Sequence, residues 1–106
     1  MTKEQFDEIT DWQDKTFPIS SEVSRINHLI KEVQELKSEA KKGINGLDIA
    51  KKMEYADCFF LLFGAAKKAG YSYEEICEFI QNKFIINKHR VWGKPDKDGV
   101  VQHIIK

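Results

Sequence analysis

Two short stretches decide how this chain is expected to fold: Glu32-Val-Gln-Glu35 and, after a glycine-containing turn, Glu54-Tyr-Ala-Asp57. In each stretch the two acids are three residues apart. On an α-helix this spacing places them on one face, with Cβ atoms about 5–6 Å apart. The turn around Gly43 to Gly46 is short, so the two helices should pack antiparallel and bring the acid pairs together.

Four carboxylates that converge in a helical core repel one another and are tolerated only if cations lie between them. Hard oxygen ligands of this kind suit Mg²⁺ or Mn²⁺ rather than zinc. We therefore predict that Mg²⁺, with Mn²⁺ as a substitute, is bound by Glu32, Glu35, Glu54 and Asp57. For any one of these acids alone, a solvated helix face with ion pairs to lysines is the simpler interpretation.

The composition is that of one ordinary globular domain, residues 1–106. Hydrophobic residues make up 42% and charged residues 32%, and the 17 basic and 17 acidic residues give a net charge of +0. The neutral balance gives no support for a nucleic-acid partner. The longest apolar run, Cys58 to Ala66, is too short to span a membrane. With a polar N-terminus and two cysteines expected to be reduced, we predict a cytoplasmic protein.

Apolar periodicity and residues typical of helix ends predict four helices and an all-α fold. Helix-capping residues and prolines set their limits. The expected spans are Thr2 to about Thr16, Ser20 or Ser21 to about Lys42, Asn45 or Gly46 to Gly70, and a fourth helix opened by the capping box Ser72-Tyr-Glu-Glu75. The second of these carries an apolar stripe at Val23, Ile26, Leu29, Ile30, Val33 and Leu36.

The chain becomes rich in turn-forming residues from Gly93 onward. Residues 100–105 form either a short strand or an extended tail. Asp98-Gly99 suits a tight turn, which would allow a small hairpin with residues 90–92. We therefore expect a four-helix bundle with a short irregular or hairpin C-terminal tail.

The third predicted helix is apolar nearly all round from Ala56 to Ala66. A helix of this kind is buried on every side, and one small chain can hardly cover it. We therefore expect a homodimer or a homotetramer, with this helix in the interface. The acids Glu54 and Asp57 beside the apolar run need partners, and Glu32 and Glu35 serve that purpose only through cations.

A second set of polar residues lies on the fourth predicted helix. Lys83, Asn87 and Arg90 are at positions i, i+4 and i+7, so they project from one side. One interpretation is a solvated basic face. The other is a phosphate clamp that faces the metal ions.

The acid pairs, together with Lys83, Asn87, Arg90 and the run Val91-Trp-Gly-Lys-Pro95 that follows them, resemble the all-α nucleoside triphosphate pyrophosphohydrolases of the MazG-like superfamily. The small phage and bacterial dATP/dGTP diphosphohydrolases are the most similar group. The resemblance covers about Phe6 to His103. It implies a MazG-like four-helix bundle that hydrolyses (d)NTPs, preferably dATP or dGTP, between the α- and β-phosphates, with two or three metal ions per site.

The resemblance also implies roles for individual residues. Glu35 would orient or deprotonate the attacking water in addition to binding metal. Lys83 and Arg90 would bind the phosphates and the leaving pyrophosphate. Asn87 would hydrogen-bond sugar or phosphate. His28, one turn before Glu32, would either support a metal-binding carboxylate or have only a structural role. The active site would lie between the second, third and fourth helices.

Aromatic side chains near chain ends and loops are candidates for stacking on a purine base. These are Trp12, Phe17 and Trp92. The alternative role for each of them is filling the small core.

Three other functions compete with this one. A di-iron carboxylate bundle would need Glu-x-x-His motifs, and neither acid pair has a histidine at that spacing. The same hydrolysis of pyrimidine nucleotides (dUTP, dCTP) or damaged nucleotides fits the same residues. A non-catalytic helical binding module would have the same composition, and metal-dependent turnover distinguishes it from an enzyme.

Overall fold

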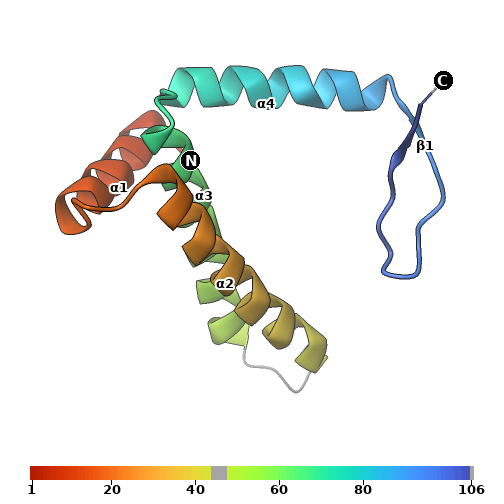
Figure 1. The fold of residues 1–106 in the computed structure, drawn as a ribbon, viewed down its shortest axis with the longest axis horizontal. Coiled ribbons are helices and arrows are strands. Elements are labelled where there is room, and N and C mark those ends of the chain that lie inside the picture. The colour runs from red at the N-terminus through yellow and green to blue at the C-terminus, as the bar shows by residue number, and fades with distance from the viewer. Residues whose placement is uncertain (44–47, 106) are drawn as a thin grey trace. The chain divides into compact units, whose positions relative to one another are not determined.

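The computed structural model describes residues 1–43 and 48–105, which contain four α-helices and one pair of short strands (Figure 1). The predicted all-α class and the hairpin tail are confirmed. The predicted start of the third helix, at Asn45 or Gly46, lies outside the described residues. The elements are α1 (Lys3–Thr16), α2 (Glu22–Lys42), α3 (Asp48–Lys68), α4 (Tyr73–Lys88), β1 (Val91–Trp92) and β2 (His103–Ile104). The chain divides into two compact units, Met1–Glu74 and Glu75–Lys106, and each is described by itself.

Local side-chain chemistry sets the N-termini of the first two helices. Thr2 caps α1, and its Oγ1 accepts a hydrogen bond from the Gln5 backbone N–H at 3.1 Å. Ser21 caps α2 through a reciprocal capping box with Ser24. The two bonds of this box, 3.0 Å and 2.8 Å long, satisfy N–H groups that have no partner within the helix.

The end of α3 is fixed by a glycine. Gly70 has φ +101°, a left-handed conformation that residues with a Cβ rarely adopt. The Tyr71 N–H donates to the Ala66 carbonyl at 3.2 Å, and the Gly70 N–H donates to the Lys67 carbonyl at 3.0 Å. This pair of bonds is the Schellman motif, and it ends the helix where the sequence predicted.

In the first unit, α2 and α3 pack side by side and α1 lies against α3 (Figure 1). Arg25 near the start of α2 contacts Gly64 near the end of α3. Farther along α2, Glu32 lies beside Glu54 and Asp57, which come earlier in α3. A later residue of α2 therefore contacts earlier residues of α3, so the two helices are antiparallel, as predicted.

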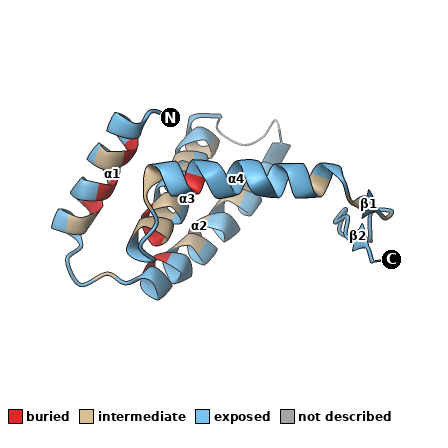
Figure 2. Cartoon of the chain, turned by 90° about the horizontal axis from the view of Figure 1, so that it is seen from above, coloured by how far each residue is buried: buried red, intermediate tan, exposed pale blue. Residues whose placement is uncertain are grey.

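The core of this unit is small and lies where the three helices meet (Figure 2). Phe6 of α1 is fully buried. Its ring contacts Phe63 edge-on, with centroids 5.9 Å apart, and it contacts Tyr73 at 5.5 Å. Such aromatic pairs contribute about 0.5–1.5 kcal/mol beyond the area that they bury. They join α1 to α3 and to the segment that follows it.

A buried arginine connects the three helices. Arg25 is 4% exposed. Its guanidinium donates to the Gly64 carbonyl at 2.9 Å, to Asp14 Oδ1 at 2.9 Å and to Ser20 Oγ at 3.0 Å. A buried charge is tolerated only when it is paired and hydrogen-bonded, and these three acceptors meet that need. Arg25 therefore fixes α2 against both α1 and α3.

A second polar contact requires a glycine in α3. The buried Gln13 side chain donates from Nε2 to the Phe60 carbonyl at 2.9 Å. A Cβ at position 64 would lie 2.5 Å from Gln13 Oε1, closer than real Cβ atoms approach. Glycine at position 64 therefore allows α1 to approach α3 closely enough for this hydrogen bond.

Much of the apolar surface stays open in a single chain. In the stripe predicted along α2, Val23, Ile26, Ile30 and Val33 are exposed. These four side chains of the stripe are therefore not covered within the isolated chain. The apolar run of α3 also leaves Phe59 and Leu62 exposed. Periodicity identified an apolar face in α2, but the core reached by α2 is limited to the region around Arg25.

The second unit consists of α4 beyond its first turn and a hairpin. β1 and β2 pair antiparallel, with Val91 opposite Ile104 and Trp92 opposite His103. The turn is organised by Asp96, whose Oδ1 accepts from the N–H groups of Asp98 and Val100, each at 2.9 Å. Gly99 has φ +79° at this turn. Among the helices that the structure describes, none is both long and apolar enough to cross a membrane.

The Arg25–Asp14 pair makes stability depend on acidic pH. Burial alone would raise the pKa of Asp14, but the hydrogen bond from Arg25 and the charges of Lys68 and Arg25 outweigh it and lower that pKa. The stabilisation is therefore present above the unfolded pKa of about 3.9 and is lost as the pH falls through the folded value. We expect Asp14→Asn to cost about 1 kcal/mol or less at pH 7, because Asp14 is 38% exposed.

Urea unfolding of the wild type and Asp14→Asn between pH 2 and pH 7 measures this difference. The two stabilities should converge as the pH falls below about 4. A difference that stays constant over the whole range would contradict the role given to the Asp14 charge.

Candidate active site

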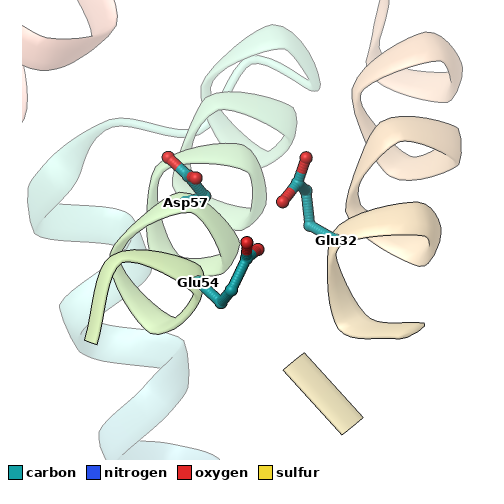
Figure 3. Close-up of side chains that lie close together, drawn as sticks. All are labelled: Glu32, Glu54 and Asp57. Atoms are coloured by element: carbon teal, nitrogen blue, oxygen red, sulfur yellow. The ribbon is translucent and has the colours of Figure 1, made fainter. Parts of the chain in front are cut away.

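Three acidic side chains converge between α2 and α3. Glu32 of α2 and Glu54 and Asp57 of α3 each offer a carboxylate oxygen, and these oxygens lie within 4.8 Å of one another. Figure 3 shows the three side chains turned toward the space between the two helices. Glu32 and Glu54 are half-buried, whereas Asp57 is exposed. We call these residues the carboxylate cluster.

The antiparallel packing explains why these three residues meet. Glu54 and Asp57 are one helical turn apart, so both face α2. Glu32 is opposite them because Arg25, seven residues earlier, is fixed against Gly64 of α3. His28 lies one turn before Glu32, and its Nε2 is 3.3 Å from Glu32 Oε1. The histidine therefore holds one oxygen of Glu32 in a defined direction.

The fourth predicted metal ligand, Glu35, is exposed and lies outside the carboxylate cluster. It is near enough to Glu54 to share a hydrogen bond that lowers the pKa of Glu54. Its assignment to metal or to the attacking water stays a prediction.

The carboxylate cluster is electrostatically unfavourable without a counter-charge. The pKa of Glu54 is raised, first by a hydrogen bond shared with Glu32, then by burial and by the charges of Glu32 and Asp57. The pKa of the neighbouring Cys58 thiol is also raised, mainly by burial and further by the same three carboxylates. A carboxyl with a raised pKa binds a proton more readily, and a cation can replace that proton.

The chemistry of the cluster fits a hard divalent cation. Glu54 Oε2 is buried and has no hydrogen-bond partner among the described residues. A buried carboxylate oxygen without a partner is costly, whereas an oxygen that coordinates a cation is satisfied. Three carboxylates within reach of one centre match the ligands that Mg²⁺ and Mn²⁺ prefer.

A pocket of about 530 Å³ extends from the carboxylate cluster to an aromatic end. Glu32 and Asp57 line one part of it. Trp12 and Phe17, two of the aromatic residues proposed to stack on a base, line another, with their rings edge-on and centroids 5.6 Å apart. The volume lies within the range of about 300–1,000 Å³ that is typical of small-molecule sites. The remaining lining residues are Gln13, Ser20, Ser24, Arg25, His28, Phe60 and Leu61.

The other predicted site residues belong to the second unit and are described within it. Lys83 is exposed, and Asn87 and Arg90 are half-buried. Asn87 Oδ1 is buried and has no hydrogen-bond partner in the described part of the chain. The Trp92 indole N–H donates to the Asn87 carbonyl at 2.9 Å, and the Trp92 ring is edge-on to His103. The roles of these residues stay predictions.

Sequence reasoning missed several residues that line the pocket, above all Arg25 and Ser20. A signal for Arg25 was available. Arg25, His28 and Glu32 follow i, i+3, i+7 spacing, so a charged arginine shares one face of α2 with a predicted metal ligand. Ser20 gave no comparable signal, because it was considered only as a helix cap.

A solved structure has the same fold. The chain is similar to the structure described as cyanophage S-2L MazG-like pyrophosphohydrolase bound to dGDP and three catalytic Mn²⁺ ions per active site. The TM-score is 0.76 and the sequence identity 24%, and the match covers 99% of both chains. The fold is therefore MazG-like and all-α, as predicted.

Sequence comparison gives the family. Residues 5–106 match the family model for dATP/dGTP pyrophosphohydrolase. A curated relative, the dATP/dGTP diphosphohydrolase of Salmonella phage PMBT28, is 36% identical over 97 residues, which is 92% of this chain. The chain belongs to the dATP/dGTP pyrophosphohydrolase family. It spans 29% of the length of the Salmonella phage relative.

Replacement of one carboxylate should change both stability and metal response. Because the pKa of Glu54 is raised in the folded protein, the carboxyl group favours folding at low pH. This contribution to the stability is lost as the pH rises through the pKa of Glu54 in the folded state. Glu54→Gln should therefore raise the thermal midpoint of the metal-free protein at pH 8. Mn²⁺ at about 100 times its Kd should stabilise the wild type by about 2.7 kcal/mol, and the variant much less.

Thermal unfolding in EDTA and in Mn²⁺ measures both effects. Glu39→Gln is the matched control, because Glu39 lies on α2, outside the cluster, and pairs with Lys42 at 2.7 Å. This control should keep the wild-type response to Mn²⁺. If Mn²⁺ stabilises Glu54→Gln as much as it stabilises the wild type, Glu54 is not a metal ligand.

Proposed function

We propose that this chain is a metal-dependent nucleoside triphosphate pyrophosphohydrolase that converts (d)NTPs, preferably dATP and dGTP, to monophosphate and pyrophosphate. One observation carries the proposal: a pocket large enough for a nucleotide is lined by two carboxylates of the cluster, Glu32 and Asp57, and by the aromatic rings of Trp12 and Phe17. Membership of the dATP/dGTP pyrophosphohydrolase family supports dATP and dGTP as substrates and the bond between the α- and β-phosphates as the bond that is cleaved.

Glu32, Glu54 and Asp57, with Glu35, hold two or three Mg²⁺ or Mn²⁺ ions in this proposal. Bound divalent ions neutralise phosphate charge and lower the pKa of coordinated water. The chain supplies a fixed set of carboxylate oxygens, including the unpartnered Glu54 Oε2. Glu35 is exposed and lies outside the cluster, and it orients the attacking water or takes its proton.

Lys83, Asn87 and Arg90 bind the phosphate chain. Lys83 and Asn87 are one helical turn apart on α4 and share one side of it, and Arg90 follows two residues after the last residue of the helix. Lys83 and Arg90 act as positive charges toward the leaving pyrophosphate, whose charge grows as the bond breaks. Asn87 supplies an amide for the sugar or for a phosphate oxygen.

The aromatic end of the pocket holds the base. Trp12 and Phe17 offer flat apolar surfaces that stack on a purine, and Trp92 is a third candidate. Stacking alone tolerates different bases because each has a π-face. The preference for purines therefore depends on the size of this end of the pocket.

The exposed apolar side chains of α2 and α3 support assembly into a homodimer or homotetramer. We propose that residues 1–106 act as one cytoplasmic domain, with no nucleic-acid or membrane partner. The family match from residue 5 to residue 106 includes both compact units, which supports a single domain.

Release of pyrophosphate from a panel of dNTPs and NTPs tests the proposed function. Each nucleotide is incubated with Mg²⁺, Mn²⁺ or EDTA. We expect EDTA-sensitive turnover that favours dATP or dGTP and falls more than about 100-fold in Glu54→Gln and Asp57→Asn. Preference for dUTP or dCTP would keep the mechanism and change the substrate. A folded protein without turnover on any nucleotide would favour a binding module.

Removal of the proposed phosphate-binding lysine tests the contribution of α4. Lys83→Ala should lower kcat/KM by about 100-fold, because a charge that stabilises the transition state is lost. Lys88→Ala is the matched control on the same helix, since Lys88 lies over the Phe84 ring at 4.9 Å. This control should stay within about twofold of wild type. Equal kinetics for Lys83→Ala and wild type would exclude Lys83 from the site.

A further inference from the structure

We infer that Arg25 and Ser20 form a positioning relay that holds Phe17 in place at the base end of the pocket. The inference rests on the proposed function, because it assigns the aromatic end of the pocket to the base. It concerns positioning residues: Arg25 and Ser20 act through Phe17.

The relay is a continuous chain of hydrogen bonds. Arg25 Nε donates to Ser20 Oγ at 3.0 Å. Ser20 Oγ then donates to the Phe17 carbonyl at 2.8 Å, and the Ser20 N–H reaches the same carbonyl at 3.1 Å. Because the arginine can only donate, the serine proton is directed toward Phe17. All three residues line the pocket.

The guanidinium at the start of the relay is buried and hydrogen-bonded to two helices. Its other nitrogens donate to the Gly64 carbonyl of α3 and to Asp14 of α1, each at 2.9 Å. Movement of Arg25 would leave a buried charge without partners, which is strongly unfavourable. Position 25 also lies two helical turns before Glu32. The relay therefore connects the carboxylate end of the pocket to the aromatic end through one rigid helix.

Phe17 needs this support because it lies just beyond the last residue of α1. Its side chain is 51% exposed. Its backbone dihedral angles, φ −123° and ψ 65°, are no longer those of an α-helix. An exposed aromatic residue on a connecting segment loses conformational freedom when a ligand binds, and prior fixation removes part of that cost. The relay holds the backbone of Phe17, and the edge-on contact with Trp12 holds its ring.

A competing explanation is that these bonds only join α1 to α2. In that case Ser20→Ala would lower stability and leave the affinity for nucleotide unchanged. If Ser20 acts through Phe17, its removal should weaken nucleotide binding only while the Phe17 ring is present. A double-mutant cycle distinguishes the two explanations.

The experiment measures the Kd of the α,β-methylene analogue of dATP in Mn²⁺ by calorimetry. The proteins are the wild type, Ser20→Ala, Phe17→Ala and the double variant. We expect Ser20→Ala to weaken binding about 5- to 10-fold, whereas the double variant should lie within about twofold of Phe17→Ala. The Kd for Mn²⁺ without nucleotide should not change in Ser20→Ala. Arg25→Ala is avoided as the primary variant, because it would remove the hydrogen bonds that join α2 to Asp14 of α1 and to Gly64 of α3, and the chain would risk unfolding.

Thr2→Ala is the matched control, because it also removes a hydroxyl that is hydrogen-bonded to the backbone, but at the other end of α1. It should leave the Kd for the analogue unchanged. An unchanged Kd in Ser20→Ala, or multiplying effects of the two substitutions in the double variant, would overturn the relay. A wild type that does not bind the analogue at all would overturn the proposed function, and the relay with it.

Discussion

The close approach of three carboxylates between two antiparallel helices is the constraint on which the rest of this structure depends. Arg25 fixes α2 against α3 at Gly64, so Glu32, Glu54 and Asp57 cannot separate without disrupting the helix pair. A hydrogen bond shared with Glu32, burial and the charges of Glu32 and Asp57 raise the pKa of Glu54, and burial together with the three carboxylates raises the pKa of the Cys58 thiol. Binding of a proton or of a cation relieves the repulsion between these carboxylates. Protons and divalent cations compete for the same oxygens, so metal binding should release protons.

The same helix pair holds polar groups of two different kinds. The guanidinium of Arg25 is buried with three acceptors, and it serves the fold. Glu32 lies two helical turns farther along α2, and the carboxylate cluster that it forms with Glu54 and Asp57 includes an oxygen with no partner among the described residues. Buried polar groups in folded proteins are normally satisfied, so an unsatisfied oxygen beside a pocket indicates a ligand. Arg25, whose hydrogen bonds are satisfied within the chain, therefore stabilises the fold, whereas the carboxylate cluster is available to bind a ligand.

The sequence predicted those features that depend on neighbours along the chain. Thr2, Ser21 and Gly70 set helix ends through local hydrogen bonds or backbone freedom, and spacing on two connected helices brought Glu32 near Glu54 and Asp57. The spacing of Arg25 from Glu32 indicated a shared helix face, but the three buried hydrogen bonds of Arg25 were not predictable, because their acceptors come from α1, a connecting segment and an α3 carbonyl. The exposed stripe at Val23 and Ile30 shows a related limit, since periodicity identifies an apolar face and does not say what covers it.

The central claim is that the carboxylate cluster holds divalent metal ions. The most direct test is a crystal structure of the wild-type protein grown with Mn²⁺, with anomalous diffraction recorded on both sides of the manganese absorption edge. The account predicts manganese peaks within about 2.0–2.4 Å of carboxylate oxygens of Glu32, Glu54 and Asp57. Well-ordered carboxylates with no manganese peak between them, in crystals saturated with Mn²⁺, would contradict it.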